Sequence, residues 1–561
     1  MMEVANKVRI YMYLVLPSSD FPTETESFGL IFDTSAGDEG LKDTEGPLYA
    51  HTGVSINGVD WKYATDWDTP VDKHKLTSLG NNKWKLEMPA GIRAFYGVPE
   101  GENIQRISFV LRNADGSKQC KSADGTDIFL DVYQPGLAIR IEAPKQTITL
   151  EPNEEFRYKI ITSAEARISL STKAGEIKNE NNVQTLSGSY SFADPGTYTL
   201  IAEAKSGIET VQDILTVNVQ ASTQEAVIPA GLQPGINYNS TDPTTVTLVL
   251  QAPYKQNVYV IGDFNDWTYS PEYQMKRDGE MFWITLTGLT AGQEYAYQYV
   301  VDGSVCIADP YTDKVLDPWN DSYIKADAYP NLKSYPSGAS GIVSVFQTGQ
   351  TDYQWKTLDF KRPDTQDLIV YELHLRDFTT EGTYKAALAK LPYLKDLGIN
   401  AIELMPVNEF EGNDSWGYNP SFYFAVDKAY GTKDDLKAFI DECHADGIAV
   451  IIDMVLNHSF GQSPLLQLYQ DEKGIPLSIS PWYNVKSNIE NPGLQWGADF
   501  NHESFYTRSF VDRVNTYWLT EYKVDGIRYD FTKGFSNTTY WKDADEYANA
   551  YDTGRIYNLT R

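Results

Sequence analysis

Cysteine, positive charge and long apolar runs are all scarce in this sequence. Its 561 residues include three widely spaced cysteines, Cys120, Cys306 and Cys443, which support neither a disulfide framework nor a zinc site. Lys and Arg number 47 against 77 Asp and Glu, a net charge of −30 that excludes nucleic acid and a bare anionic membrane as default partners. No run approaches the roughly 18 apolar residues of a membrane span, and no apolar segment at the start predicts a signal peptide.

Aromatic residues, in contrast, are plentiful. They make up 13% of the chain and include 38 Tyr and 12 Trp, side chains that combine an apolar face with a polar group. Such surfaces suit sugar rings, which have apolar C–H faces and hydroxyl rims, and they suit half-buried sheet edges equally well. At roughly 100 to 200 residues per domain, the length predicts three to five domains.

The first three segments of the chain are predicted to be all-β. Short alternating runs broken by Gly, Asn, Asp and Pro indicate a β-sandwich over residues 1–135, an immunoglobulin-like sandwich over 136–222 and a third sandwich over 223–345. Residues 221–226 have the composition of a linker. These segments account for the larger part of the chain.

Residues 346–561 change to alternating strands and helices. Four strands are predicted, near residues 368, 401, 448 and 524. Near-continuous apolar strands that alternate with helices are typical of a parallel sheet, and a (β/α)8 barrel is the natural candidate.

Two helices connect these strands. One is predicted over residues 384–397, with a kink at Pro392. The other begins with the capping-box pair Thr432 and Asp435 and ends at Gly447.

Asp453 stands inside the apolar run of the third strand, where an ionised carboxylate is costly unless it is paired or used. Asn457 and His458 follow it closely. In a parallel barrel the carboxyl ends of the strands form the catalytic mouth, so these three side chains are candidate site residues. A carboxylate that caps the following loop is the alternative.

The fourth strand carries a second cluster, in Gly-Ile-Arg-Tyr-Asp-Phe-Thr-Lys from Gly526 to Lys533. Residues two apart in a strand share a face, so Arg528 and Asp530 point the same way. An Arg beside an Asp stabilises the carboxylate form, and an ionised carboxylate is what a nucleophile near neutral pH requires. A structural salt bridge is equally compatible with the pattern.

Together these motifs resemble the conserved regions of glycoside hydrolase family 13, the α-amylase family. The matching stretches, in the family's order, are Trp416 to Pro420 with 423–425, Asp453 to His458, Ala498 to Asn501 and Gly526 to Lys533. The run Val258 to Trp267, with Ile307 to Tyr311, resembles the early-set, glycogen-binding-type module that precedes such barrels. Trp267 in that run is either structural or ligand-facing.

The resemblance implies a multidomain fold class: tandem immunoglobulin-like sandwiches, then the N-terminal part of a (β/α)8 barrel with an inserted loop at about 459–503. That loop, with Trp482, Tyr483 and Trp496, would cover the substrate.

The resemblance also implies roles for individual residues. Asp530 is the nucleophile and Arg528 holds it ionised. Substrate binding falls to Asp453, His458, Tyr418, Trp416 and Lys533. Gly534 stands where the family often has His, so contacts to the acceptor sugar are less defined. Asn457 and Asp499 match positions that ligate a structural calcium in many α-amylases.

The implied function is that of an α-amylase-type retaining glycoside hydrolase acting on α-glucans such as starch, glycogen and maltooligosaccharides. No cofactor is required apart from the possible calcium, and the partner is the glucan itself. An α-1,6 branching or debranching enzyme and a non-catalytic glucan-binding protein are the alternatives. Tandem sandwiches on such an enzyme suggest an extracytoplasmic bacterial protein.

One essential group is missing. A retaining glycosidase needs an acid/base carboxylate about 5 to 5.5 Å from its nucleophile, and in the family this Glu follows a fifth strand. After Asp530 the sequence predicts only a loop and a helix over 544–559, where Asp543, Asp545, Glu546 and Asp552 form a charged face. We therefore expect the sequence to be the N-terminal portion of a longer enzyme and this chain to be inactive.

Overall fold

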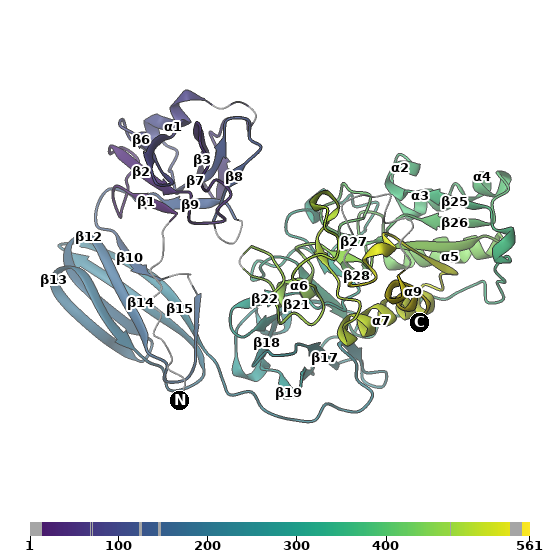
Figure 1. Ribbon diagram of the computed structural model, residues 1–561. Coiled ribbons are helices and arrows are strands. Elements are labelled where there is room, and N and C mark those ends of the chain that lie inside the picture. Colours follow the sequence, from purple (N-terminus) through teal and green to yellow (C-terminus); the bar gives the residue numbers. More distant parts are fainter. Residues whose placement is uncertain are drawn as a thin grey trace. The chain divides into compact units, whose positions relative to one another are not determined.

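A computed structural model describes residues 14–67, 69, 71–122, 126–143, 147–471, 473–538 and 552–561. The chain divides into two compact units, one drawn from residues 1–148, 153–193 and 198–217 and the other from residues 149–152, 194–197 and 218–561 (Figure 1). Among the described residues, no helix is long and apolar enough to cross a membrane.

The first unit begins with two antiparallel sheets around one core. One sheet has the order β1 (Val15–Pro17), β2 (Phe28–Asp33), β6 (Lys83–Met88), β5 (Thr77–Gly80). The other has the order β4 (Val59–Lys62), β3 (Leu48–Ile56), β7 (Arg106–Asn113), β8 (Gln119–Cys120), with β9 (Ile128–Asp131) paired to β7. Alternate residues of β2 and β6 point inward and are buried, as the period of two in a strand requires. A 3-10 turn (Asp72–His74) and α1 (Ile92–Tyr96) complete it.

The rest of the first unit is a six-stranded sheet. Its order is β10 (Ile139–Glu142), β12 (Phe156–Thr172), β14 (Gly196–Ser206), β15 (Glu209–Val219), β11 (Thr147–Leu150), with β13 (Gly175–Tyr190) paired to β12. The β-structure predicted here is present, whereas the immunoglobulin-like arrangement and the boundaries between the four predicted domains stay predictions.

The second unit opens with two more antiparallel sheets, which we call the module. One has the order β16 (Gly235–Tyr238), β17 (Val246–Gln251), β20 (Met281–Leu286), β19 (Lys276–Asp278). The other has the order β18 (Val258–Gly262), β21 (Glu294–Val301), β24 (Val343–Gln347), β23 (Val315–Leu316), with β22 (Val305–Ile307) paired to β21. The predicted linker is not loose: Ala221 donates its backbone N–H to Tyr259 and accepts from Gln274, both at 2.7 Å.

A parallel sheet follows, with its four strands in chain order. They are β25 (Val370–Leu373), β26 (Ala401–Leu404), β29 (Ala449–Met454) and β32 (Gly526–Tyr529), all mutually parallel. The four predicted strands are confirmed. Two short antiparallel pairs sit in the connections: β27 (Asn408–Phe410) with β28 (Pro420–Val426), and β30 (His458–Ser459) with β31 (Ala498–Asp499).

The helix predicted over 384–397 is two helices, α3 (Tyr384–Leu388) and α4 (Leu391–Asp396). Pro392 lies in the first turn of α4, where its missing N–H costs nothing, so the predicted kink is a break. The capping box is confirmed: Thr432 Oγ1 accepts from the Asp435 N–H at 3.2 Å, and α5 runs Lys433–Ala445. The other helices are α2 (Leu375–Phe378), α6 (Pro464–Gln467), α7 (Phe505–Glu521) and α9 (Thr553–Thr560).

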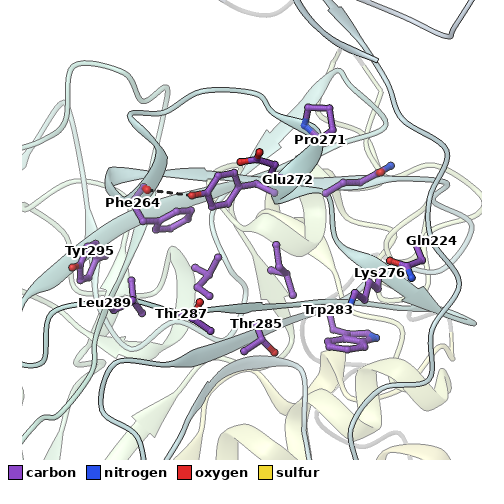
Figure 2. A pocket seen from close by; sticks show the side chains of 15 residues that line it. Gln224, Phe264, Pro271, Glu272, Lys276, Trp283, Thr285, Thr287, Leu289 and Tyr295 are labelled. Atoms are coloured by element: carbon purple, nitrogen blue, oxygen red, sulfur yellow. Dashed lines mark hydrogen bonds between the residues drawn. The ribbon is translucent and has the colours of Figure 1, made fainter. Parts of the chain in front are cut away.

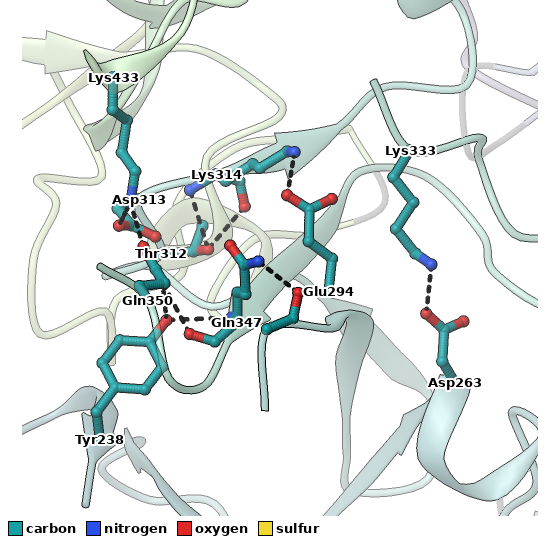
Figure 3. Close-up of polar contacts among 11 residues, drawn as sticks. Tyr238, Asp263, Glu294, Thr312, Asp313, Lys314, Lys333, Gln347, Gln350 and Lys433 are labelled. Atoms are coloured by element: carbon teal, nitrogen blue, oxygen red, sulfur yellow. Dashed lines mark hydrogen bonds and ion pairs between the residues drawn. The ribbon is translucent and has the colours of Figure 1, made fainter. Parts of the chain in front are cut away.

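The module and the parallel sheet share one hydrophobic core, which contains side chains from β17 and β21 as well as from β26, α5 and β29. Polar contacts reinforce it. Lys433 at the start of α5 pairs with Asp313 of the module, and Gln350 donates to Tyr238 at 3.2 Å (Figure 3). Tyr469 donates its hydroxyl to the Pro253 carbonyl. The module is therefore a fixed part of the second unit.

Of the charged helix predicted over 544–559, the structure shows α9, whose N-cap is Asp552. Asp543, Asp545 and Glu546 lie outside the described residues.

Candidate active site

The register of β29 and β32 brings the two predicted clusters together. Asp453 is the direct neighbour of Arg528, and the Asp530 N–H donates to the Met454 carbonyl at 3.1 Å. Arg528 Nη1 lies 2.8 Å from Asp453 Oδ2 and 2.8 Å from Asp530 Oδ1. One guanidinium nitrogen thus bridges both carboxylates, which confirms that Arg528 and Asp530 point the same way.

Asp453 is the buried member of this group. Burial raises its pKa to about 6, although hydrogen bonds from Tyr418 and Arg528 lower it. Tyr418 donates its hydroxyl to Asp453 Oδ2 at 2.8 Å. The other oxygen, Oδ1, is buried and has no hydrogen-bond partner among the described residues. A buried carboxylate oxygen in that state is ready to accept a hydroxyl of a ligand.

His458 lies behind Tyr418. Its Nε2 is 2.9 Å from the Tyr418 carbonyl, which can only accept, so Nε2 carries the proton, and Nδ1 accepts from the Asn457 amide at 2.7 Å. Burial lowers the pKa of His458 and favours this neutral form. Both ring nitrogens are therefore engaged by the protein, and His458 can meet a sugar hydroxyl only by exchanging a partner.

Exposed indoles stand near the bridged carboxylates. Trp416 is 60% exposed, two residues before Tyr418. Trp496 is 46% exposed and its ring centroid lies 5.2 Å from that of Phe531, the residue after Asp530. Phe531 has φ 44°, a left-handed conformation that is rare for a bulky side chain and typical of functional turns.

The inserted loop contributes less surface than its aromatic content predicts. Trp482 and Tyr483 are fully or almost fully buried and belong to the core, so Trp496 alone of the three remains for a ligand. Lys533 lies in the 3-10 turn Thr532–Gly534. A Cβ on Gly534 would meet Asn457 Cβ at 2.6 Å, which explains why a larger residue is not accommodated here.

Asn457 and Asp499, the predicted calcium ligands, face a polar cluster. Asp499 Oδ2 accepts from Asn484 Nδ2 at 2.8 Å and from the Asn488 N–H at 3.2 Å. Burial raises the pKa of Asp499 to about 7. Asn457 Oδ1 and Asn488 Oδ1 are buried without a hydrogen-bond partner in the part of the chain that the structure describes. One carboxylate and two unpaired amide oxygens are the donor types that calcium prefers, so the residues present fit this ion.

Two acidic residues escaped the sequence-based prediction. Glu372 and Glu403 are paired in register on β25 and β26, and their carboxylates gather with that of Asp453 within 4.8 Å. Glu403 Oε1 also lies 3.8 Å from Arg528 Nε. The signal was available, because each stands in a short apolar strand as Asp453 does.

The module shows a cavity of its own, about 610 Å3, lined by Phe264, Glu272, Lys276, Leu289 and Tyr295 among others (Figure 2). Trp267 is not among its lining residues. Its indole N–H donates to Asp263 at 3.1 Å, and Gly338 packs so closely that a Cβ there would lie 2.6 Å from Trp267 Cβ. These contacts favour the structural alternative for Trp267.

Comparison with known proteins bears on the same residues. Two protein-family models match this chain. "Alpha amylase, catalytic domain" matches residues 346–486, and "Carbohydrate-binding module 48 (Isoamylase N-terminal domain)" matches residues 233–319. Residues 346–486 are thus similar to an alpha-amylase catalytic domain. The segment matched by this domain contains Tyr418, Asp453 and His458, and the segment matched by the carbohydrate-binding module precedes it.

Two curated relatives extend the similarity. A malto-oligosyltrehalose trehalohydrolase of Saccharolobus solfataricus is 31% identical over 293 residues, covering 52% of this chain and 44% of that protein. A 1,4-alpha-glucan branching enzyme GlgB of Pseudoalteromonas atlantica is 30% identical over 389 residues, covering 66% of this chain and 48% of that protein. This chain thus spans about half the length of the curated relatives it matches. One similar solved structure is a pullulanase from Paenibacillus barengoltzii in complex with maltohexaose and alpha-cyclodextrin. The aligned part covers 55% of this chain and 49% of the pullulanase chain, with 19% sequence identity and a TM-score of 0.43.

Proposed function

We propose that the second unit carries the nucleophile side of a retaining active site for α-glucans. Asp530 attacks the anomeric carbon, the glycosidic C–O bond breaks, and a β-glucosyl ester of Asp530 forms; water then cleaves this ester. Arg528 holds Asp530 in place through their ion pair. The observation that carries the proposal is the single guanidinium nitrogen 2.8 Å from both Asp453 and Asp530, beside a buried Asp453 oxygen that has no hydrogen-bond partner among the described residues.

The surrounding residues bind the sugar. Asp453 Oδ1 accepts a hydroxyl, Tyr418 stacks on the ring in the same subsite, and His458 orients Tyr418 and exchanges a hydrogen bond with the sugar. Trp416 and Lys533 serve the outer subsites.

The motifs assign no described carboxylate to the acid/base. Among the described residues, the carboxylates gathered with Asp453 are those of Glu372 and Glu403, which stand on strands β25 and β26. Acid catalysis contributes roughly 100- to 10,000-fold. The 561-residue chain therefore binds maltooligosaccharides and turns them over slowly or not at all.

A substrate with an activated leaving group tests whether Asp530 acts as nucleophile without an acid/base. With α-maltotriosyl fluoride, whose fluoride leaves without a proton, the chain should gain the mass of a maltotriosyl group on Asp530, whereas Asp530→Asn should gain none. With maltoheptaose, release of reducing ends should stay below about 0.1 per second, at least 100-fold under the median enzyme turnover of about 10 per second. No adduct on Asp530 would contradict the nucleophile, and rapid maltoheptaose hydrolysis would contradict the missing acid/base.

Hydrolysis and transfer remain two versions of the same chemistry. The matched relatives bear the names of a trehalohydrolase and a branching enzyme, so an α-1,6 branching or debranching activity is the second candidate. Should the whole protein be active, its products from amylose and from pullulan separate the two. A purely glucan-binding role predicts no adduct on Asp530.

A structural calcium belongs to the same proposal. Asn457, Asp499 and Asn488 would hold it through side-chain oxygens, and it would fix the inserted loop beside the strand that carries Asp453.

A further inference from the structure

The first unit carries a group of aromatic rings on the outer face of one sheet. In β3 the buried residues alternate with His51, which points away from the core. The His51 ring stacks on Trp61 of β4, with centroids 5.0 Å apart and planes at 25°, and meets the edge of Trp67 at 4.9 Å. The Arg112 guanidinium lies 4.8 Å from the Trp67 centroid. Three rings thus form a continuous group, and the Arg112 side chain beside Trp67 is buried.

The three rings are only partly buried, unlike the core beneath them. His51, Trp61 and Trp67 all keep partial contact with solvent, and the neighbouring Tyr63 is exposed. Rings that served only packing would bury more completely, as Phe109 does on the inner face. A cluster of partly exposed aromatic rings is a common mark of a ligand-binding surface.

Some polar atoms of the three rings have no hydrogen-bond partner among the described residues. No described residue hydrogen-bonds to the His51 ring nitrogens or to the Trp67 indole N–H, whereas the Trp61 N–H donates to Asp127 at 3.1 Å. Burial lowers the pKa of His51, so at neutral pH its ring offers one donor and one acceptor. The surface therefore combines apolar faces with free hydrogen-bonding groups at their edges.

The backbone holds these rings in place. Trp61 and Tyr63 have φ values of 61° and 58°, left-handed conformations that bulky residues rarely adopt. Gly53 of β3 lies under the hairpin, where a Cβ would meet the Lys62 carbonyl at 3.0 Å. β4 thus packs closely along β3 at the edge of the sheet, and a preorganised surface loses little entropy on binding.

We infer that His51, Trp61 and Trp67 form a glucan-binding site of the first unit, additional to the site around Asp530. The indole faces take the apolar C–H faces of consecutive pyranose rings, and the His51 and Trp67 N–H groups bind their hydroxyls. That the glucan is α-linked rests on the function proposed for the second unit. The site would hold a polysaccharide chain and would play no part in bond cleavage.

Affinity electrophoresis of the full chain in gels containing soluble starch tests the site. The double variant Trp61→Ala/Trp67→Ala should lose at least fivefold in apparent affinity, since aromatic anchors at binding surfaces typically cost more than a factor of five when truncated. Trp67→Phe, which retains a ring, should keep most of the retardation. Tyr393→Ala, which removes an exposed ring from α4 in the second unit, is the matched control and should change nothing. Unchanged melting temperatures check that the variants are folded.

The outcomes separate this inference from the proposed function. Undiminished retardation of the double variant would overturn the inference, as would equal retardation in a β-1,4-glucan gel. Binding of maltotriose at the Asp530 site, measured by calorimetry and abolished by Tyr418→Ala, reports on the proposed function alone. A chain that binds maltotriose in this way and is retarded equally with and without Trp61 and Trp67 would keep the proposed function and lose the second site.

Discussion

The second unit contains two clusters in which one cationic side chain lies between two carboxylates. Arg528 lies between Asp453 and Asp530 and its side chain is 41% exposed. Lys428 lies between Glu409, at 2.5 Å, and Asp321 of the module, at 3.3 Å, and its side chain is 4% exposed. The charges are alike, but only the first group is open to a ligand.

The closed group acts as a structural joint. Burial lowers the pKa of Lys428, but Glu409 and Asp321 raise it more, so the ammonium stays charged. Burial beside Glu409 raises the pKa of Asp427 well above its usual range, which keeps this neighbour protonated. Because Asp321 comes from the module, its ion pair with Lys428 ties the module to the β27–β28 pair. Solvent access therefore distinguishes the charge cluster for which we propose a catalytic role from the one that joins parts of the second unit.

Removing the buried cation should have the largest effect. Lys428→Met leaves Glu409 and Asp321 buried without a counter-ion, which typically costs about 3 to 5 kcal/mol of unfolding free energy. Differential scanning calorimetry of the second unit's transition measures the loss. The double variant Lys428→Met/Glu409→Gln should recover part of it, because one unpaired charge is gone. A single variant as stable as the wild type would show that the two clusters do not differ.

The Asp499 cluster should give the next largest effect, through pH and calcium. The folded-state pKa of Asp499 is raised to about 7 from an ordinary 3.8, so its stabilising contribution is complete below about pH 4 and is lost as the pH rises through 7. The wild type should lose about 2 to 4 kcal/mol over this window, and Asp499→Asn should lose less. Asp453, with a pKa of about 6, contributes with the same sign in both proteins.

Calcium should reverse that loss. At pH 8, calcium at 100 times its dissociation constant would stabilise the wild type by about 2.7 kcal/mol, visible as a higher melting temperature, and should leave Asp499→Asn unaffected. At pH 5 the gain should shrink, because protons compete for the carboxylate. A wild type whose melting temperature at pH 8 is the same with calcium and with a chelator would rule out the metal while leaving the pH prediction standing.

Altering the exposed cation should change folding stability least. Arg528→Lys keeps the charge but cannot bridge both carboxylates in the same geometry. Because water reaches the pair, the unfolding free energy should change by less than about 1 kcal/mol, while affinity for maltoheptaose should fall roughly tenfold, about 1.4 kcal/mol. Calorimetric titration and thermal unfolding of the same sample measure both. A loss of stability as large as that of Lys428→Met would mean that Arg528 is structural.

The sequence predicted the open cluster far better than the closed one. Asp453, Arg528 and Asp530 stand out locally, because a charge within an apolar strand is anomalous and residues two apart share a face. The register that sets Arg528 beside Asp453 is not local, since a shift of one residue between strands far apart in sequence would separate them. Lys428 and Asp321 lie about a hundred residues apart in the sequence, Asp321 in the module and Lys428 after β28. No sequence pattern predicts that they are in contact.

Burial explains the other differences. Trp482 and Trp496 look alike in the sequence, yet the first is in the core and the second is exposed, because only packing decides which face of a loop turns inward. The same holds for Glu372 and Glu403, whose convergence on Asp453 depends on the pairing of three strands. Helix ends were predictable where capping chemistry is local, as at Thr432, and less so at Pro392.

The shared core of the module and the parallel sheet limits where this protein can be truncated and which of its parts can be transferred between genes separately. Arg513 of α7 donates to the Pro234 carbonyl and stacks 4.4 Å from the Tyr311 ring, and residues from both parts fill one apolar interior. A shortened gene that starts at residue 346 would expose that interior and yield insoluble protein, whereas one that starts before Asn218 would keep it covered. The two parts are consequently expected to pass between genomes as a single piece.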